Sequence, residues 1–160
     1  MTRRELPLDA FRILEVLTEH DVDYVVIGGL AVQAHGHTRT TQDVDLIPSE
    51  TDENLTRLAR ALEALNARAA GLAGTASTTA LVLPTDGVAS LDTDAGGVDI
   101  HLAPPGAPDY TSLRERALVI DVRGLRVPVA GRDDLIRMKR ASGRPVDRGD
   151  VLALTEPRPE

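Results

Sequence analysis

The sequence lacks cysteine and is poor in aromatic residues: its 160 residues include no Cys, no Trp, two Tyr and one Phe. The absence of cysteine excludes disulfide bonds, thiolate catalysis and cysteine-ligated zinc. With only Phe11, Tyr24 and Tyr110, the chain cannot build a row of aromatic side chains that stack on single-stranded bases. No apolar run reaches the roughly 18–20 residues of a membrane span. No apolar signal segment follows the first residues, so we expect a cytoplasmic protein with no membrane partner.

Basic residues are also in deficit. Lys and Arg total 18 against 25 Asp and Glu, which gives a formal net charge of −7. This balance argues against a broad DNA-binding surface, although net charge leaves room for a local basic groove. Lys139 is the only lysine, and the other basic residues are arginines. In such a chain, we expect Lys139 to serve a purpose that a guanidinium does not serve.

Hydrophobic periodicity predicts a single α+β domain over residues 1–155, followed by a frayed tail at 156–160. Ser49, three residues before Asp52, marks the expected start of the third helix. The predicted helices span residues 8–20, 30–35, 49–68, 133–141 and 147–154. The predicted strands span residues 24–27, 44–47, 79–84, 97–102, 118–122 and 125–129. Loops are expected at 69–79 and 103–109, and a turn between the strands at 79–84 and 97–102.

Three aspartates are expected to share one face of the sheet. Asp43 and Asp45 lie two residues apart on a predicted strand, so both side chains point to the same side. Asp99 lies on the polar face of an alternating strand that could lie beside the first. Close carboxylates repel one another unless a cation lies between them, and hard oxygen ligands suit Mg²⁺ or Mn²⁺. Three carboxylates on adjacent strands can hold two such ions.

A glycine pair precedes this acidic cluster. Gly28 and Gly29 follow a strand and precede a short helix, where glycine permits positive φ and a close approach of the backbone to a phosphate. Taken singly, an Asp-x-Asp segment is commonly surface charge and a Gly-Gly pair is commonly a simple turn. The joint order of glycines and carboxylates, however, indicates a metal-bound triphosphate.

Together, Gly28-Gly29, His35-Gly36, Arg39, Thr41 and Asp43-Val44-Asp45-Leu46 resemble the signature of the DNA polymerase beta-like nucleotidyltransferase superfamily. The version here is most similar to the Gly-Gly branch that contains the AbiE-type and MenT-type toxins. The resemblance implies the nucleotidyltransferase fold, a small mixed β-sheet flanked by helices. It also implies that Asp43 and Asp45 bind two Mg²⁺ (or Mn²⁺) ions, and that Asp99 shares one ion and takes the proton of the attacking hydroxyl. The turn at Gly28-Gly29 would hold the β- and γ-phosphates.

Other polar residues near this motif have two interpretations each. The chain lacks the serine of the commoner Gly-Ser signature, and Thr41 is the best substitute for a hydroxyl contact to phosphate; alternatively it bonds its own backbone. Arg39 could reach a phosphate or the acceptor, or neutralise the acidic cluster. His101 shares the strand face of Asp99 and could line the site behind the metal ligands, whereas His35 is expected to be a packed or capping residue.

The C-terminal segment from Asp133 to Asp150 also resembles this branch, in which a helix lysine is followed by an arginine and two aspartates. Lys139 would contact the triphosphate or the leaving pyrophosphate as a compact charge, with a solvated helix lysine as the alternative. Arg144 is a weaker phosphate candidate. Asp147 is expected to be a helix N-cap, and Asp150 a structural salt-bridge partner.

The resemblance implies an enzyme that transfers NMP from an NTP to a hydroxyl of a macromolecular acceptor, either an RNA 3′ end such as that of tRNA or a protein. Such an enzyme could be the toxin of a toxin–antitoxin system with a cognate antitoxin. A small-molecule, antibiotic-type nucleotidyltransferase is the alternative, although such enzymes usually hold their acceptor between aromatic walls. A non-catalytic nucleotide-binding or antitoxin-like partner is the third hypothesis, but it would be expected to have lost one of the acids.

Overall fold

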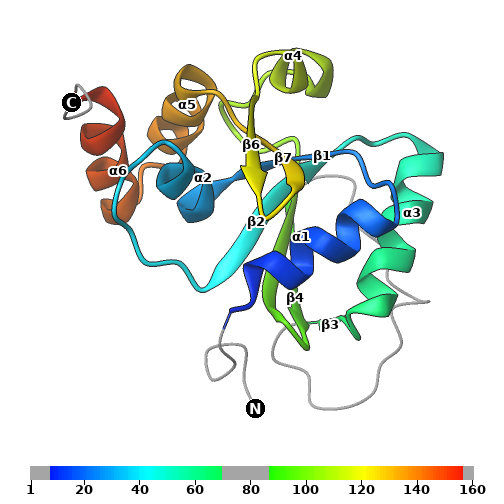
Figure 1. Cartoon of the computed structure of the whole chain (residues 1–160). Helices are drawn as coiled ribbons and strands as arrows, with labels where there is room; N and C mark the ends of the chain where they lie inside the picture. Colours follow the sequence, from blue (N-terminus) through cyan, green and yellow to red (C-terminus); the bar gives the residue numbers. More distant parts are fainter. Residues whose placement is uncertain (1–7, 70–86, 157–160) are drawn as a thin grey trace.

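The computed structural model describes residues 8–69 and 87–156. Of the loop predicted at 69–79, the strand predicted at 79–84 and the tail predicted at 156–160, all but Ala69 and Glu156 lie outside these residues, and Ala69 is in a strand rather than a loop. In the described part of the chain, seven strands form one mixed sheet in the order β3-β4-β5-β2-β1-β7-β6, with helices packed around it (Figure 1). This arrangement confirms the predicted α+β class. Within the same residues, no helix is both long enough and apolar enough to cross a bilayer.

The elements follow the chain as an alternation of helices and short strands. The helices are α1 (Ala10–Glu19), α2 (Gly28–Ala34), α3 (Asp52–Ala64), α4 (Tyr110–Glu115), α5 (Arg132–Ser142) and α6 (Pro145–Thr155). The strands are β1 (Tyr24–Ile27), β2 (Asp43–Pro48), β3 (Arg68–Ala69), β4 (Gly87–Thr93), β5 (Gly96–Leu102), β6 (Leu118–Val122) and β7 (Leu125–Val129).

The core explains why β1, β2 and β5 lie at the centre of the sheet. All four residues of β1 are buried, as expected for a short apolar strand covered on both faces. Val44 and Leu46 of β2 are fully buried, whereas Asp43 and Asp45, which alternate with them, are only partly buried. β5 alternates in the same way. Each of these two strands therefore turns its apolar side chains to the core and its polar ones to the opposite face.

The predicted third helix is wrong at both ends. Thr51, not Ser49, is the N-cap, because its hydroxyl accepts the backbone N–H of Asn54. The helix ends at Ala64 rather than near Arg68, since Asn66 adopts a φ of 54° and turns the chain into β3. The second helix begins at Gly28, two residues before the predicted start.

The turn expected between residues 84 and 97 is also wrong, since β4 occupies much of this stretch. All of β4 pairs with β5 in an antiparallel hairpin, from Gly87 opposite Leu102 to Thr93 opposite Gly96. The first half of β4 is largely exposed, so its sequence carries little of the apolar alternation that reveals a strand.

The C-terminal helices begin earlier than expected, and α4 was not predicted. α6 begins at Pro145 with Arg144 as its N-cap, which corrects the assignment of Asp147 to that position. Asp147 is instead the third helical residue, and its carboxylate accepts the backbone N–H of Arg144. α4 is short and buries only Leu113, so it leaves no periodic signal.

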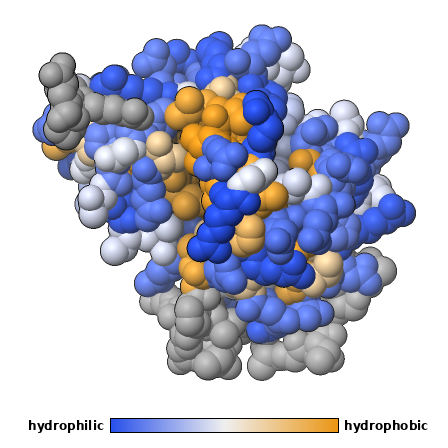
Figure 2. All heavy atoms as spheres, in the orientation of Figure 1, coloured by the Kyte–Doolittle hydropathy of each residue, from blue (hydrophilic) through white to orange (hydrophobic). Residues whose placement is uncertain are grey.

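An apolar groove of about 250 Å³ lies between α1, α2 and the β6–β7 hairpin. Hydrophobic residues form a band on this face of the molecule (Figure 2). Arg123, at the tip of the hairpin, lies over the ring of Phe11, with its guanidinium carbon 4.8 Å from the ring centre. The aspartates of β2 and β5 do not line this groove, so it is separate from the polar cluster described next.

Candidate active site

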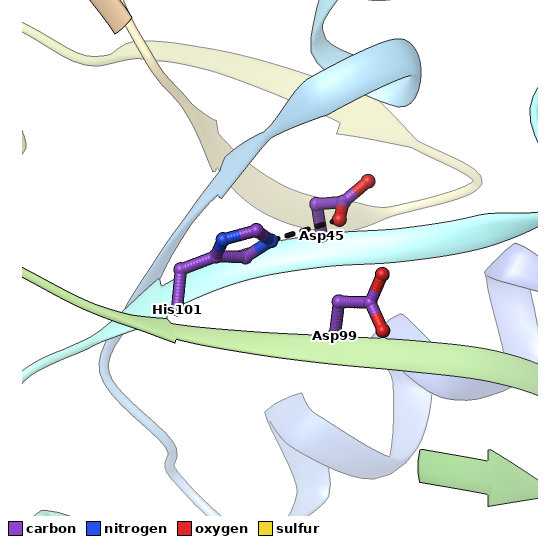
Figure 3. A group of neighbouring side chains, drawn as sticks. All are labelled: Asp45, Asp99 and His101. Carbon is purple, nitrogen blue, oxygen red and sulfur yellow. Dashed lines mark hydrogen bonds and ion pairs between the residues drawn. The ribbon is translucent and has the colours of Figure 1, made fainter. Parts of the chain in front are cut away.

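The sheet register brings two of the predicted carboxylates together. β2 and β5 are parallel neighbours, and Asp45 lies directly opposite Asp99. These two side chains and His101 each offer one ligand atom, and the three atoms lie within 4.8 Å of one another. Figure 3 shows the three side chains on the same face of the two strands. Two oxygen donors and one nitrogen donor at this spacing fit a divalent cation.

His101 is a closer member of the site than the sequence suggested. Its Nε2 lies 2.9 Å from Oδ1 of Asp45, and both side chains are 19% exposed. The hydrogen bond fixes the orientation of the Asp45 carboxylate. The signal was present in the sequence, because His101 follows Asp99 by two residues on an alternating strand.

Asp43 is placed less centrally. It lies on the same side of β2 as Asp45, two residues earlier, and opposite Gly97 of β5. It is not one of the three residues whose ligand atoms come within 4.8 Å. The structure therefore gathers Asp45, Asp99 and His101 most closely, with Asp43 at the next position along the strand.

The glycine pair is packed directly against the acidic cluster. Gly28 has a φ of +72°, and a Cβ added to it would lie 2.4 Å from Oδ2 of Asp45. A Cβ on Gly29 would lie 2.1 Å from Nη1 of Arg39. Gly28 therefore needs glycine, because its backbone is left-handed and the Asp45 side chain leaves no room for a Cβ. At Gly29 the group in the way is the end of the flexible Arg39 side chain, so the requirement for glycine is weaker there.

Substitution of Gly28 by alanine is expected to reduce nucleotide-dependent activity by about tenfold or more, because the new methyl group displaces the Asp45 carboxylate and the left-handed backbone is strained. The matched control is Gly149→Ala in α6, where an added Cβ meets nothing within 4 Å. That variant is expected to gain about 0.5–1 kcal/mol in unfolding free energy with unchanged activity. Equal activity of the two variants would contradict the conclusion that position 28 needs glycine.

A second cluster of charges lies beside the glycine turn. Nε of Arg39 donates to Oδ1 of Asp150 at 2.8 Å. Nζ of Lys139 lies 2.9 Å from Oδ2 of Asp150 and 3.2 Å from Oδ1 of Asp147. Nε of Arg144 donates to Oδ2 of Asp147 at 2.9 Å. Three cations and two carboxylates thus form one chain of contacts, and Lys139 is only 6% exposed.

This network links the loop before β2 to the C-terminal helices and shifts the pKa values of two of its members, Asp147 and Arg144. Burial alone would raise the pKa of Asp147, but hydrogen bonds from Arg144, Ser142 and Lys139 outweigh it and hold that pKa well below its usual range. The hydrogen bond to Asp147 raises the pKa of Arg144, and the charge of Asp45 adds to the effect. Arg144 therefore lies within the electrostatic reach of the acidic cluster.

The lowered pKa of Asp147 predicts how stability changes with pH. Its pKa is depressed in the folded chain, so the stabilisation is fully present above the unfolded value of about 3.9 and is lost as the pH falls below it. We expect the unfolding free energy of the wild type to exceed that of Asp147→Asn at neutral pH, and the difference to shrink below about pH 4. Urea denaturation over a pH series measures this; a constant difference would exclude Asp147 as the source. Asp52→Asn, at an exposed carboxylate, is the control.

Two further predicted residues make internal contacts. The hydroxyl of Thr41 donates to the carbonyl of Asp43 at 3.0 Å, which is the backbone alternative considered for it. His35 is buried, and its Nε2 lies 2.9 Å from the carbonyl oxygen of Ala130, which confirms it as a packed residue. Gln33, which the sequence did not single out, donates to the carbonyl of Arg39 and ties down the loop before β2.

The mixed sheet flanked by helices matches the fold of solved nucleotidyltransferase structures. A model of one family, described as a nucleotidyltransferase of unknown function (DUF6036), matches residues 8–155. The chain belongs to this family. No curated protein matches the sequence.

Solved structures share the fold at low sequence identity. The lincosamide antibiotic adenylyltransferase LnuA, in its lincomycin-bound form, is 15% identical with a TM-score of 0.65, covering 94% of this chain and 98% of its own. ANT(2″)-Ia in complex with adenylyl-2″-tobramycin is 18% identical with a TM-score of 0.62, covering 90% and 84%. A nucleotidyltransferase-like protein from Paracoccidioides brasiliensis is 18% identical with a TM-score of 0.56, covering 92% and 77%.

Proposed function

We propose that the protein transfers NMP from an NTP to a hydroxyl group of a macromolecular acceptor, either an RNA 3′ end or a protein. The observation that carries this proposal is the placement of Asp45 opposite Asp99, next to a glycine turn that only glycine can form. In the reaction, the acceptor oxygen forms a bond to the α-phosphorus and the bond to the bridging oxygen breaks. The products are acceptor-NMP and pyrophosphate.

The site fits divalent cations, since carboxylate oxygens and an imidazole nitrogen converge within 4.8 Å. Asp43, Asp45 and Asp99 would hold two Mg²⁺ or Mn²⁺ ions, with His101 orienting Asp45 or ligating directly. When bound, such ions stabilise negative charge on the attacking and leaving oxygens of an in-line displacement.

The remaining roles fall to residues of this chain. Asp99 accepts the proton of the attacking hydroxyl. The turn at Gly28-Gly29 holds the β- and γ-phosphates, with Thr41 beside it. Arg39 and Arg144, now bonded to Asp150 and Asp147, would offset phosphate charge. Positioning and electrostatic stabilisation carry most of the catalysis in phosphoryl transfer, so loss of any of these phosphate contacts is expected to lower the rate of transfer.

Lys139 is proposed to act on the leaving pyrophosphate. Its ammonium group donates to Asp147 at 3.2 Å and forms an ion pair with Asp150 at 2.9 Å. An ammonium group has three N–H donors, and one of those not used for Asp147 would serve a phosphate oxygen.

A macromolecular acceptor is preferred to a small molecule because of where the aromatic residues lie. Tyr24 is 3% exposed in the core, Tyr110 packs partly buried against the core, and Phe11 lies beneath Arg123 at the tip of the β6–β7 hairpin. None of the three supplies a free aromatic wall for a flat acceptor. LnuA and ANT(2″)-Ia nevertheless keep a small-molecule acceptor as the second candidate, on the likeness of fold over most of each chain.

The resemblance to AbiE-type and MenT-type toxins extends the proposal to a cytoplasmic toxin with a cognate antitoxin. Growth arrest on expression, relieved by loss of the acidic cluster, would support this role. A non-catalytic, antitoxin-like partner is disfavoured because Asp43, Asp45 and Asp99 are all present.

Incubation with each α-labelled NTP, Mg²⁺, and either total RNA, cell lysate or a panel of aminoglycosides and lincosamides tests the proposal. Label in RNA or protein, abolished by EDTA, is the expected result. Label in the small molecules alone would establish the second candidate. Absence of transfer with every NTP and every acceptor would overturn the proposal.

A further inference from the structure

The exposed surface of the α5–α6 hairpin has a charge opposite to that of the whole chain. The protein carries a net charge of −7, yet five of the six exposed charged residues in this hairpin are arginines. The acids of the hairpin are mostly buried: Asp134 and Asp147 are each 1% exposed and Asp150 is 5% exposed. The exposed charged residues are Arg132, Asp133, Arg137, Arg140, Arg144 and Arg148.

Three of these arginines line an open groove of about 460 Å³ along α5. Arg132 and Arg140 are eight residues apart, which places them on one helix face, and Arg137 lies beside them. Asp133, Ile136 and Thr155, the last residue of α6, also line the groove. The helix has eleven residues and is therefore about 16 Å long. Arg140 forms no ion pair with any residue in 8–69 or 87–156.

The arginine surface reaches the proposed active site. Arg144 lies where α5 passes into α6, its side chain is 66% exposed, and the charge of Asp45 acts on it. Arg144 is also joined through Asp147, Lys139 and Asp150 to Arg39, which packs against Gly29. In Figure 1, α5 and α6 lie side by side next to α2, which begins with the glycine pair.

We propose that this surface holds the phosphate backbone of a helical RNA whose 3′ end enters the active site. This inference rests on the proposed function and selects RNA among its acceptors. Guanidinium groups match phosphate oxygens in bidentate geometry, and every exposed cation here is an arginine. Residues 132–155 contain no aromatic side chain on which unstacked bases could be held. A surface that reads backbone rather than bases suits the shape of an RNA duplex.

Binding of a fluorescent RNA hairpin with a short single-stranded 3′ overhang, measured by anisotropy without NTP, tests the surface. The test variant is Arg137→Gln/Arg140→Gln, in which Asp134 keeps its two hydrogen bonds from Arg116. The matched control is Arg60→Gln/Arg126→Gln, which removes two exposed arginines from α3 and β7. The test variant is expected to weaken binding about tenfold or more and to reduce the salt dependence of log Kd by about two. The control is expected to bind as the wild type does.

Several results would overturn the proposal. These are no binding of the hairpin by the wild type, equal weakening in the control variant, or equally tight binding of an unstructured RNA of the same length. Equally tight binding of a polyglutamate peptide would show instead a surface for acidic proteins. Because the experiment contains no NTP, its failure is separate from failure of NMP transfer, which the labelling experiment reports.

Discussion

Replacement of Asp45 by asparagine is expected to lower NMP transfer by at least about 100-fold, the size of effect that follows loss of one charged contact to a transition state. Asp45 lies between three features of the site: it is opposite Asp99, hydrogen-bonded to His101 and in contact with the turn at Gly28. Asparagine keeps the shape of the side chain and removes its charge. The loss should therefore appear in divalent-ion affinity and in turnover, with the fold intact.

Transfer of α-labelled NMP, Mg²⁺ titration and thermal unfolding together measure this result. Asp52→Asn, at an exposed acid in the first turn of α3, is the control and should remain fully active. An Asp45→Asn enzyme that transfers NMP at the wild-type rate would remove Asp45 from the metal site. A variant that is inactive because it is unfolded would be recognised by its melting curve.

Lys139→Met is expected to lower the unfolding free energy by about 1.5–3 kcal/mol, the range for loss of a hydrogen bond to a charged group, because Asp147 and Asp150 keep Arg144 and Arg39 as partners. The ammonium is 6% exposed and lies between Asp147 and Asp150, whose side chains are 1% and 7% exposed. Urea denaturation measures the change. Arg140→Met, one residue along α5 at an exposed position, should stay within about 0.5 kcal/mol of the wild type. Equal unfolding free energies of the two variants would show that the ion pairs of Lys139 with Asp147 and Asp150 do not stabilise the fold.

Lys139→Arg separates the structural role of this residue from its proposed role in catalysis. Arginine preserves the charge and can still pair with Asp147 and Asp150, so the fold should persist. Its planar guanidinium cannot place a compact charge at the same point, and turnover is therefore expected to fall. Unchanged kinetics in this variant would remove Lys139 from the list of phosphate ligands.

Local patterns predicted the elements that hold the site. The apolar run at 24–27, the two-residue spacing of Asp43 and Asp45, and the alternation around Asp99 each reflect a period that backbone geometry imposes. They correctly gave β1, β2 and β5 and the face on which the aspartates lie. They could not give the order of strands, because β2 pairs with β5 across a stretch of chain that carries no signal of the pairing.

Contacts between distant segments account for what the sequence did not reveal. The pairing of Arg39 with Asp150 spans 111 residues and depends on the packing of α6 beside the loop before β2. The same packing places Lys139 between two carboxylates, where the sequence suggested either a phosphate ligand or a solvated residue. β4 escaped prediction because its partner strand, rather than its own composition, makes it a strand.

The ion pair between Arg39 and Asp150 also has a consequence for the order in which the site is assembled during translation. The glycine turn and β2 leave the ribosome early, but the residues that fix Arg39 and Lys139 belong to α6, the last helix. A growing chain that has produced only the N-terminal motif therefore has its acids and glycines without the cations in place. The proposed activity therefore requires α6 to leave the ribosome and dock, so a nascent chain that stops before α6 is expected not to consume nucleotide.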